Sequence, residues 1–260
     1  MSKFSKVLRR SLPSAAGIAL AALLAGCGAT AGVVHYAPGE EAFVAGKELY
    51  QTGDLGECAR ALKAYLDATP GGPNAEEASY LIGVAYSRLG QHTMAQVELR
   101  HFLDVYPASP RLPEVEYQLA LSYWEDSRPA AYDQEKTVYA RAQVQRFLVL
   151  YPESPRVPDA KKLLEATRDR LAEKEVLNAR LYTHLKQPGS VVFHAQKVLT
   201  EFADSPWAAE ALYLKGLGLE EWGKDAEARQ AWELLVKEKS GTEWAERARE
   251  KLARTALEHP

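Results

Sequence analysis

The chain has 260 residues, of which 47% are hydrophobic, enough apolar material for a packed core of ordinary domain size. Ala, Leu, Glu, Lys and Arg are abundant and runs of Val and Ile are scarce, a bias that favours helix over sheet. The formal net charge of −3 becomes −7 without residues 1–26, which argues against nucleic acid or an anionic lipid surface as the partner.

Residues 1–26 have the pattern of an export signal. Four cations precede an apolar stretch that runs from Ala15 to Gly26. A bilayer span needs about 20 apolar residues, so this stretch is too short to be a membrane helix. The pattern therefore predicts a secretory signal peptide over residues 1–26.

The signal ends in "LAGC", residues 24–27, which resembles the lipobox of bacterial lipoproteins. The resemblance implies cleavage before Cys27, whose new N-terminus would carry a diacylglycerol and a fatty acyl chain such as palmitate. Gly28 is not the aspartate that retains such lipoproteins in the inner membrane, which implies the outer membrane. A soluble export signal with an incidental cysteine is the alternative. Loss of residues 1–26 removes four cations and no acids, and it changes the formal charge from −3 to −7.

The chain has two cysteines, Cys27 and Cys58. If Cys27 is acylated, no intramolecular disulfide is possible, even in an oxidising compartment. We therefore expect Cys58 to be a small buried side chain rather than a reactive thiol.

Beyond a lipidated linker at 27–38, a nine-residue motif indicates an internal repeat. "YPASPRLPE" (106–114) and "YPESPRVPD" (151–159) are nearly identical, and "FADSP" (202–206) is a worn third copy. A proline once per period, with small residues at fixed offsets before it, is typical of stacked helical hairpins. The offsets match a tetratricopeptide (TPR) repeat, in which small residues let the two helices of a hairpin approach closely and a glycine forms their turn.

The small residue of the first helix recurs five times, with irregular spacing. These residues are Gly46, Gly83, Ala120, Ala179 and Gly216. The third repeat has an enlarged loop between its helices, around Pro129. The fourth repeat contains 14 extra residues, about four helical turns, and we expect one long helix over residues 158–186.

These observations predict an all-α, right-handed α-solenoid of five TPR-like hairpins with a C-terminal capping helix, over residues 39–257. The expected repeats are approximately 39–70, 74–107, 111–152, 156–203 and 206–240, with the cap at 243–255. In this interpretation each nine-residue motif is a corner between successive hairpins, and Pro113 and Pro158 lie in the first turn of the next helix.

Aromatic side chains recur on the first helices of the early repeats, three residues before or four after the small residue. They are Phe43, Tyr50, Tyr80, Tyr117 and Trp124. Exposed aromatics supply much of the energy in peptide-binding grooves, so these positions predict a peptide groove. The alternative is that the rings pack between repeats.

Six residues before each small residue stands a glutamate. The set is Glu40, Glu77, Glu114, Glu173 and Glu210. One interpretation is an acidic rail that selects basic partners. The other is a favourable interaction of each anion with the dipole at a helix N-terminus.

No pattern of catalysis is present in the sequence. The six histidines do not have the spacing of a metal site, and neither a glycine-rich phosphate loop nor a nucleophile elbow occurs. We therefore expect a protein that is not an enzyme, with no metal and no cofactor apart from the lipid on Cys27.

The combination of lipobox, five repeats, widened third repeat and lengthened fourth helix resembles the BamD family of outer-membrane assembly lipoproteins. The most similar stretch is "RDRLAEKEVLNARLYTHL", residues 168–185. Its matching residues are Asp169, Arg170, Leu171, Ala172, Glu175, Ala179 and Tyr182. The family resemblance implies a periplasm-facing scaffold of the machinery that folds β-barrel proteins into the outer membrane.

The resemblance also implies partners. The C-terminal repeats would bind the barrel-forming subunit through its periplasmic domains, with Arg180, His184 and His194 as candidate contacts. The N-terminal repeats would contact unfolded barrel proteins, and other assembly lipoproteins would join the complex. Phe202-Ala203 departs from the Tyr-Pro expected at the end of the fourth repeat. A pilotin-type TPR lipoprotein, which assists secretin or pilus assembly, is the alternative function.

Overall fold

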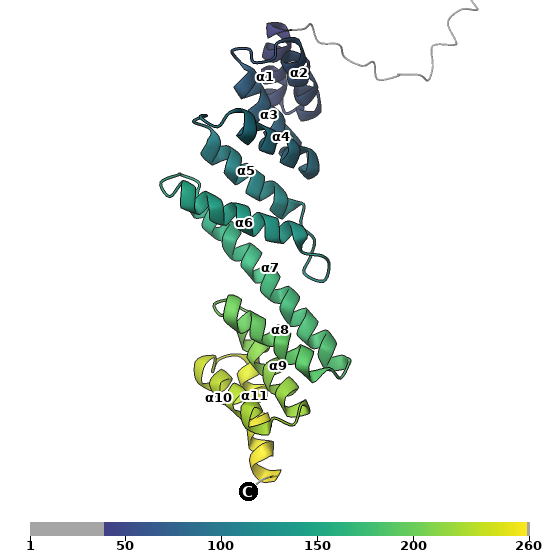
Figure 1. Ribbon diagram of the computed structural model, residues 1–260, viewed down its shortest axis with the longest axis vertical. Helices are drawn as coiled ribbons and strands as arrows, with labels where there is room; N and C mark the ends of the chain where they lie inside the picture. The colour runs from purple at the N-terminus through teal and green to yellow at the C-terminus, as the bar shows by residue number, and fades with distance from the viewer. Residues whose placement is uncertain (1–38, 259–260) are drawn as a thin grey trace, which may run out of the picture. The chain divides into compact units, whose positions relative to one another are not determined.

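The computed structural model describes residues 39–258, and these residues form eleven α-helices and no strand (Figure 1). The expected signal peptide and lipidated linker, including Cys27, lie outside the described residues. The helices are α1 (Glu40–Thr52), α2 (Leu55–Ala68), α3 (Ala75–Arg88), α4 (His92–Val105), α5 (Leu112–Glu125), α6 (Glu135–Leu150), α7 (Val157–His184), α8 (Pro188–Glu201), α9 (Ala208–Glu221), α10 (Asp225–Glu238) and α11 (Glu243–Glu258).

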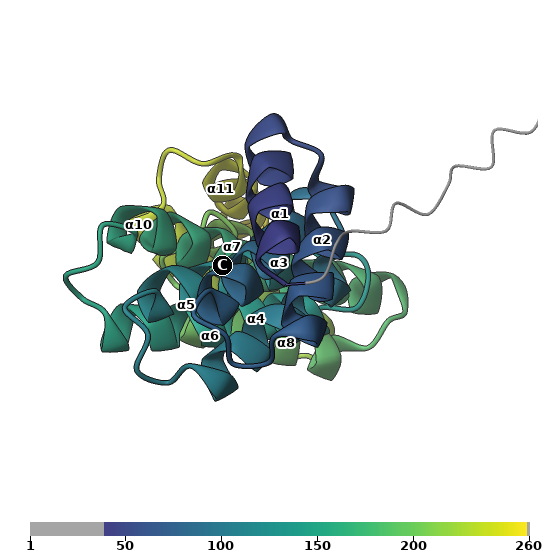
Figure 2. The same cartoon turned by 90° about the horizontal axis from the view of Figure 1, so that it is seen from above.

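The helices stack in chain order. Each packs against its neighbours in sequence, and the odd-numbered helices α1, α3, α5, α7, α9 and α11 also contact one another in series. No two even-numbered helices are in contact within residues 39–258. Figures 1 and 2 show this succession from the side and from above. The described chain is thus an all-α solenoid of helical hairpins, as the sequence predicts, and its odd-numbered helices share one surface.

Close helix approach explains the glycines inside three of the odd-numbered helices. A Cβ added at Gly83 would lie 2.7 Å from Leu99 Cδ2 of the facing helix. The equivalent distances are 2.5 Å from Gly46 to Leu62 Cδ2 and 2.1 Å from Gly216 to Trp232 Nε1. Any side chain at these positions would separate the two helices of a hairpin, because the space is already filled by the facing side chain.

The repeated motif forms the same corner twice. The backbone N–H of Ser109 donates to the Tyr106 carbonyl at 3.0 Å, and the Ser109 hydroxyl accepts from the backbone N–H of Arg111 at 3.0 Å. In the second corner the corresponding distances, at Ser154 and Arg156, are 3.1 and 3.3 Å. The serine closes the turn, and an arginine follows it as the N-cap residue of α5 and of α7.

Helix α7 is a single helix of 28 residues, which confirms the predicted long helix. Near its start, Ala160 and Leu163 are buried in a core shared with α5 and α6, whereas Val176 and Ala179 near its end are buried with α8 and α9. Its middle turns also hold the enlarged loop of the third repeat, where Arg170 Nη1 donates to Ser127 Oγ at 2.6 Å. The insertion therefore links two hydrophobic cores through one continuous helix.

Cys58 lies in α2 and is fully buried. Burial raises the pKa of its thiol to about 11, although the positive charge of Arg88 acts in the opposite direction. The thiol is therefore protonated at neutral pH and protected from reagents, which confirms the structural role that the sequence indicates.

Candidate functional site: a cleft on the first three repeats

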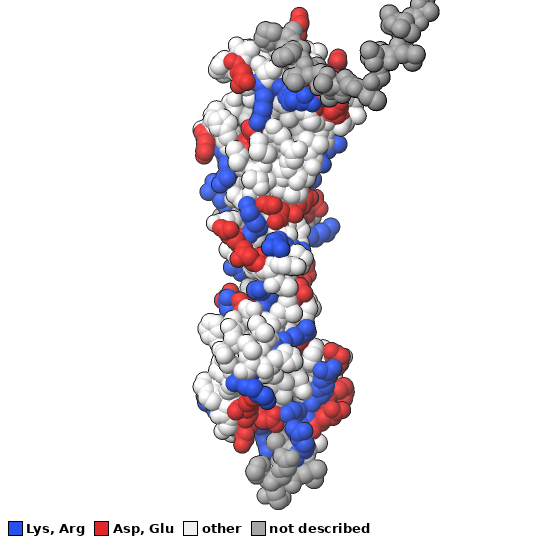
Figure 3. Space-filling view, turned by 90° about the vertical axis from the view of Figure 1, so that its right-hand side faces the viewer, with Lys and Arg blue, Asp and Glu red and all other residues white. Residues whose placement is uncertain are grey.

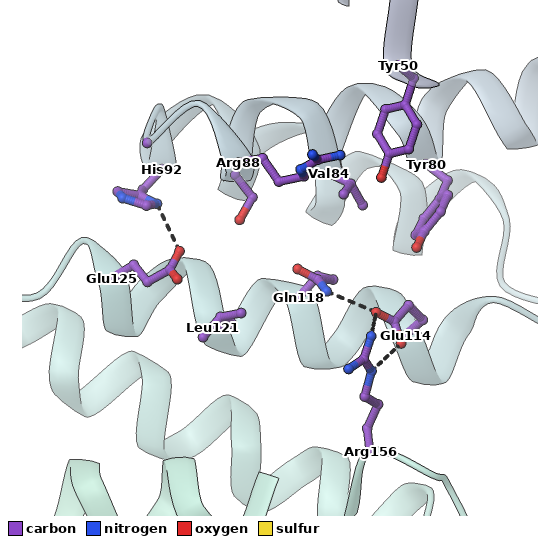
Figure 4. A pocket seen from close by; sticks show the side chains of 12 residues that line it. Tyr50, Tyr80, Val84, Arg88, His92, Glu114, Gln118, Leu121, Glu125 and Arg156 are labelled. Atoms are coloured by element: carbon purple, nitrogen blue, oxygen red, sulfur yellow. Dashed lines mark hydrogen bonds and ion pairs between the residues drawn. The ribbon is translucent and has the colours of Figure 1, made fainter. Parts of the chain in front are cut away.

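A cleft of about 670 Å³ lies on the surface formed by α1, α3 and α5 (Figure 4). One wall comes from α3 and the tip of α1, the other from α5, and Arg156 reaches in from the N-cap of α7. The cleft therefore spans the first three repeats, on the surface that the odd-numbered helices share.

Aromatic and aliphatic side chains line one part of the cleft. Tyr50 and Tyr80 face it from α1 and α3, with Val84 beside them and Leu121 opposite (Figure 4). The guanidinium carbon of Arg88 lies 5.2 Å from the centre of the Tyr50 ring, a cation–π contact. Arg88 makes no ion pair within the part of the chain that the structure describes. Its positive charge is therefore available to a carboxylate ligand.

The wall on α5 carries a closed network around Glu114. Arg156 donates two hydrogen bonds of 2.8 Å to this carboxylate, and Gln118 donates a third of 2.9 Å. Burial of Glu114 opposes its ionisation, but the bonds from Arg156 and Gln118 outweigh burial and lower its pKa. Glu114 is consequently an ionised and fully engaged group rather than a free acid.

At the far end of the cleft, His92 at the start of α4 faces Glu125 of α5. The distance from His92 Nδ1 to Glu125 Oε2 is 3.6 Å, and this buried nitrogen makes no hydrogen bond within the described residues. The cleft thus combines a cation without an ion pair, Arg88, with an apolar wall and polar ends. This combination suits an extended polypeptide that carries apolar side chains and a carboxylate.

The structure places two of the five predicted groove aromatics, Tyr50 and Tyr80, in the cleft. The prediction is wrong for Phe43 and Tyr117, which are only 5% and 8% exposed because they pack against core rings of the second helices. Trp124 does not line the cleft either. The guanidinium carbon of Arg170, on α7, lies 3.7 Å from the centre of the Trp124 ring and covers it.

The prediction of an acidic rail is also wrong, because most of the five glutamates are not free carboxylates. Lys47 lies 3.0 Å from Glu77, and Arg156 holds Glu114. Glu210 is 3% exposed and accepts two hydrogen bonds from Arg180. Of the other two glutamates, Glu40 accepts from Asn74 at 2.8 Å, and Glu173 makes no ion pair within the described residues. Most of these five glutamates therefore join one repeat to the next. On the face shown in Figure 3, positive and negative side chains lie interspersed.

A family model described as "YfiO: Outer membrane lipoprotein" matches residues 36–234. The chain belongs to the YfiO family of outer-membrane lipoproteins. This is the BamD-like family that the sequence resembles, so the resemblance is confirmed. A comparison with curated protein sequences found no match.

Solved structures with related folds include MamA from Desulfovibrio magneticus RS-1, which is 15% identical, with coverage of 80% of this chain and 99% of that chain and a TM-score of 0.39. A thermophilic TPR protein of Thermus thermophilus is 17% identical over 83% of this chain and 97% of that chain, with a TM-score of 0.32. The TPR domain of P58(IPK) is 16% identical over 84% of this chain and 56% of that chain, with a TM-score of 0.31.

Two residues that shape the cleft of this YfiO-family chain were missed in the sequence, Val84 and Leu121. Each directly follows the small residue of its repeat. The residues at the same position in the first and fourth repeats, Lys47 and Arg180, are cations that pair with a glutamate of the next repeat. The seams beside Lys47 and Arg180 are therefore bridged by an ion pair, whereas Val84 and Leu121 leave room for the cleft. Comparison of this position across the repeats would have located the cleft.

The predicted partner contacts lie at the α7–α8 hairpin. His184 is exposed at the end of α7, whereas Arg180 is held by Glu210. His194 Nδ1 lies 2.6 Å from Glu175 Oε2, and the His194 ring stacks on Tyr182. His184 is thus accessible to a partner, while Arg180 and His194 serve first to join helices.

An apolar surface surrounds this hairpin. Its large exposed side chains are Leu181, Leu185, Phe193 and Trp222, which are 52%, 53%, 64% and 50% exposed. The Trp222 ring lies 3.7 Å from the position of a Cβ on Gly189, so it rests on the start of α8. These exposed apolar side chains make the hairpin a candidate interaction surface.

Two further findings concern only residues 39–258. No group of three or more His, Cys, Asp or Glu side chains there is placed to hold a metal ion. None of the helices there has both the length and the hydropathy that a bilayer crossing requires.

Proposed function

We propose that this protein is a lipid-anchored scaffold, facing the periplasm, of the machinery that assembles β-barrel proteins in the outer membrane. The observation that carries the proposal is the YfiO family match across residues 36–234. The solenoid fold supports it, because stacked hairpins offer extended surfaces for several partners at once. The family match does not favour the pilotin-type alternative.

The C-terminal repeats are proposed to bind the barrel-forming subunit through its periplasmic domains. The exposed side chains at the α7–α8 hairpin support this role, because Leu181, Leu185 and Phe193 would be costly to leave in water without a partner. His184 lies on the same hairpin and adds a polar contact. Other assembly lipoproteins would join the same complex.

The N-terminal repeats are proposed to hold segments of unfolded barrel proteins in the cleft. Tyr50, Tyr80 and Val84 offer surface to apolar side chains, and Arg88 offers a charge to a carboxylate of the segment. Segments that are still unfolded fit this chemistry, because their backbone and side chains are both exposed. No catalytic step is required of such a scaffold.

The anchor is proposed to be the lipid on Cys27. One acyl chain binds a membrane only marginally, so the several chains of a lipoprotein account for firm attachment. We expect Cys27→Ala to fold normally and to appear in the soluble fraction. A Cys27→Ala protein that still sediments with membranes would show that lipidation is not the anchor.

The scaffold role is tested by gentle solubilisation of the native complex followed by mass spectrometry of what co-purifies. We expect an outer-membrane barrel that bears periplasmic domains. Phe193→Glu should remove it, whereas Val44→Glu, which places the same charge at a 49% exposed position on α1, should retain it. Co-purification with a secretin in place of such a barrel would overturn the proposal.

A further inference from the structure

A second groove, of about 570 Å³, lies between the two copies of the corner motif. Pro110 and Pro113 of the first corner form one side, and residues 150–155 of the second corner form the other. Glu114 lines both this groove and the cleft, so the two hollows are neighbours. We call the second hollow the corner groove.

The lining of the corner groove is rich in proline and poor in backbone donors. Four of its nine residues are prolines, which have no backbone N–H. A peptide that added a β-strand here would lack main-chain partners, because strand addition depends on a row of backbone donors and acceptors. Leu150, which is 49% exposed, adds further apolar surface. The groove therefore suits an apolar segment that does not need a main-chain ladder.

A polyproline II segment meets this condition. It has no internal hydrogen bonds, its backbone stays solvated, and its proline rings point outward on three sides. Such segments bind in grooves lined by aromatic rings. Tyr151 provides a ring, packed 5.8 Å from Phe147, and its hydroxyl makes no hydrogen bond within the described residues. Burial raises the pKa of Tyr151, so this hydroxyl keeps its proton and can donate to a ligand carbonyl.

The charge at the groove indicates what accompanies the prolines. The Glu114 carboxylate is occupied by two hydrogen bonds from Arg156. Glu153, the other acid of the lining, is exposed and makes no ion pair among residues 39–258. One carboxylate at the groove is thus available to a cation of the ligand.

We propose that the corner groove binds a proline-rich segment of a partner protein, in the polyproline II conformation, with an arginine or lysine beside its prolines. This inference goes beyond the scaffold function, since neither the C-terminal apolar surface nor the cleft includes residues 150–155. The scaffold would then hold a proline-rich partner in the corner groove and, at the same time, another ligand in the cleft or on the C-terminal apolar surface.

The proposal is tested with a fluorescent proline-rich peptide of about twelve residues, roughly four turns of polyproline II, that carries two arginines. Fluorescence anisotropy with the purified soluble chain (Cys27→Ala) measures its affinity. Two comparison peptides have the prolines replaced by glycine or the arginines replaced by glutamate. We expect saturable binding of the first peptide only. Equal binding of the glycine peptide, or no saturable binding of the first, would overturn the proposal.

Three variants locate the binding. Leu150→Lys should weaken it by about tenfold or more, because it places a charge in the apolar lining and repels the arginines of the peptide. Tyr151→Phe keeps the ring against Phe147 and should weaken binding by about fivefold through loss of one hydrogen bond. Glu153→Gln should weaken binding of the arginine peptide by about twofold to fivefold, as expected for an exposed ion pair.

Val97→Lys is the matched control, since Val97 is also 49% exposed but lies on α4 outside the groove. It should bind like the parent chain. A loss in Val97→Lys as large as that in Leu150→Lys would show that the effect is not local and would also overturn the assignment.

Discussion

The corner that leads into α7 and the corner that leads into α9 begin alike and then differ. At the first, Ser154 accepts a hydrogen bond from the backbone of Arg156, and the Arg156 side chain turns back to Glu114 of the preceding repeat. At the second, Ser205 closes the same backbone turn, but the residue that follows the proline is Trp207, which packs into the core between α7 and α9.

The two regions also differ in which part of the chain supplies the cation that holds the repeat's glutamate. Glu114 of α5 is held by Arg156, a cation from the corner that follows its repeat. Glu210 of α9 is instead held by Arg180 of α7, the first helix of the preceding repeat, just as Glu77 of α3 is held by Lys47 of α1. Glu210 is also the more buried acid, at 4% side-chain exposure against 28% for Glu114. The same repeat position is thus satisfied by two different neighbours.

The repeats share the close packing of their two helices, but they differ at the seams between one repeat and the next. The hairpins rely on close helix approach, whereas the seam between the early repeats leaves an open cleft whose cation, Arg88, makes no ion pair within the described residues. We infer that hairpin closure sets the stability of each repeat, while the seam between repeats sets what the surface can bind.

Close helix approach, which the hairpins share, is tested at Gly83. Gly83→Leu should destabilise the protein by about 3 kcal/mol or more, because the first side-chain atom alone would lie 2.7 Å from Leu99. Gly56→Ala is the control, since its Cβ would meet nothing within 4 Å and should be neutral or stabilise by about 0.5–1 kcal/mol. Urea unfolding measures both. An unchanged midpoint for Gly83→Leu would refute the role of close approach.

Truncation of three arginines to alanine tests how the ion pairs of the two regions differ. Arg180→Ala should cost about 3 kcal/mol, because it leaves the buried Glu210 carboxylate without its partner. Arg156→Ala should cost about 1–2 kcal/mol, since Glu114 is less buried and keeps its bond from Gln118.

Arg111→Ala completes the series. Arg111 occupies the same motif position as Arg156 but lies 3.9 Å from Glu76 with both side chains more than a third exposed, so its loss should cost about 0.5 kcal/mol or less. Equal losses for Arg111 and Arg156 would show that the motif, rather than the burial of its carboxylate, decides the contribution.

The hairpins could be predicted from the sequence because their determinants are local. Small residues, turn glycines and corner prolines recur at fixed offsets within one repeat, and each has one steric consequence. The long helix α7 followed from an insertion of almost whole helical turns, which leaves the buried stripe in phase.

The site was predicted less well because its determinants lie between repeats. Tyr80 and Tyr117 occupy the same offset, yet Tyr80 lines the cleft and Tyr117 is buried. Each ring lies near an aromatic ring of its own second helix, but Tyr117 also shares a core with Ala160 and Leu163 of α7 in the next repeat, a long-range contact. The glutamate row was misread for the same reason, since its cations come from helices 30 or more residues away.

Acid should remove the contribution of the Arg156–Glu114 ion pair to the free energy of unfolding. The pKa of Glu114 is lowered from 4.5 in the folded state, so the ionised form favours folding. Its contribution is complete above the unfolded pKa and is lost as pH falls through the lower folded value. The difference in unfolding free energy between the parent chain and Arg156→Ala should therefore shrink below about pH 4.5. A difference that stays constant down to pH 2 would contradict an ionic contribution.

Cys58 offers the most local test of how far the two regions are independent. In a Cys27→Ala chain it is the one remaining thiol. Because burial removes its access to solvent and raises its pKa to about 11, a thiol reagent can modify it only when the first hairpin opens. The labelling rate at neutral pH thus reports local opening of the N-terminal repeats.

In a solenoid each repeat depends chiefly on its neighbours, so the position of a mutation should decide its effect on this rate. Gly83→Leu, in the adjacent repeat, should accelerate Cys58 labelling strongly. Arg180→Ala, in the fourth repeat, should leave the rate nearly unchanged even if it lowers the overall midpoint. If both variants accelerated labelling equally, α7 would couple the two cores into one cooperative unit, and the specialisation of the early seam could not be separated from the stability of the rest.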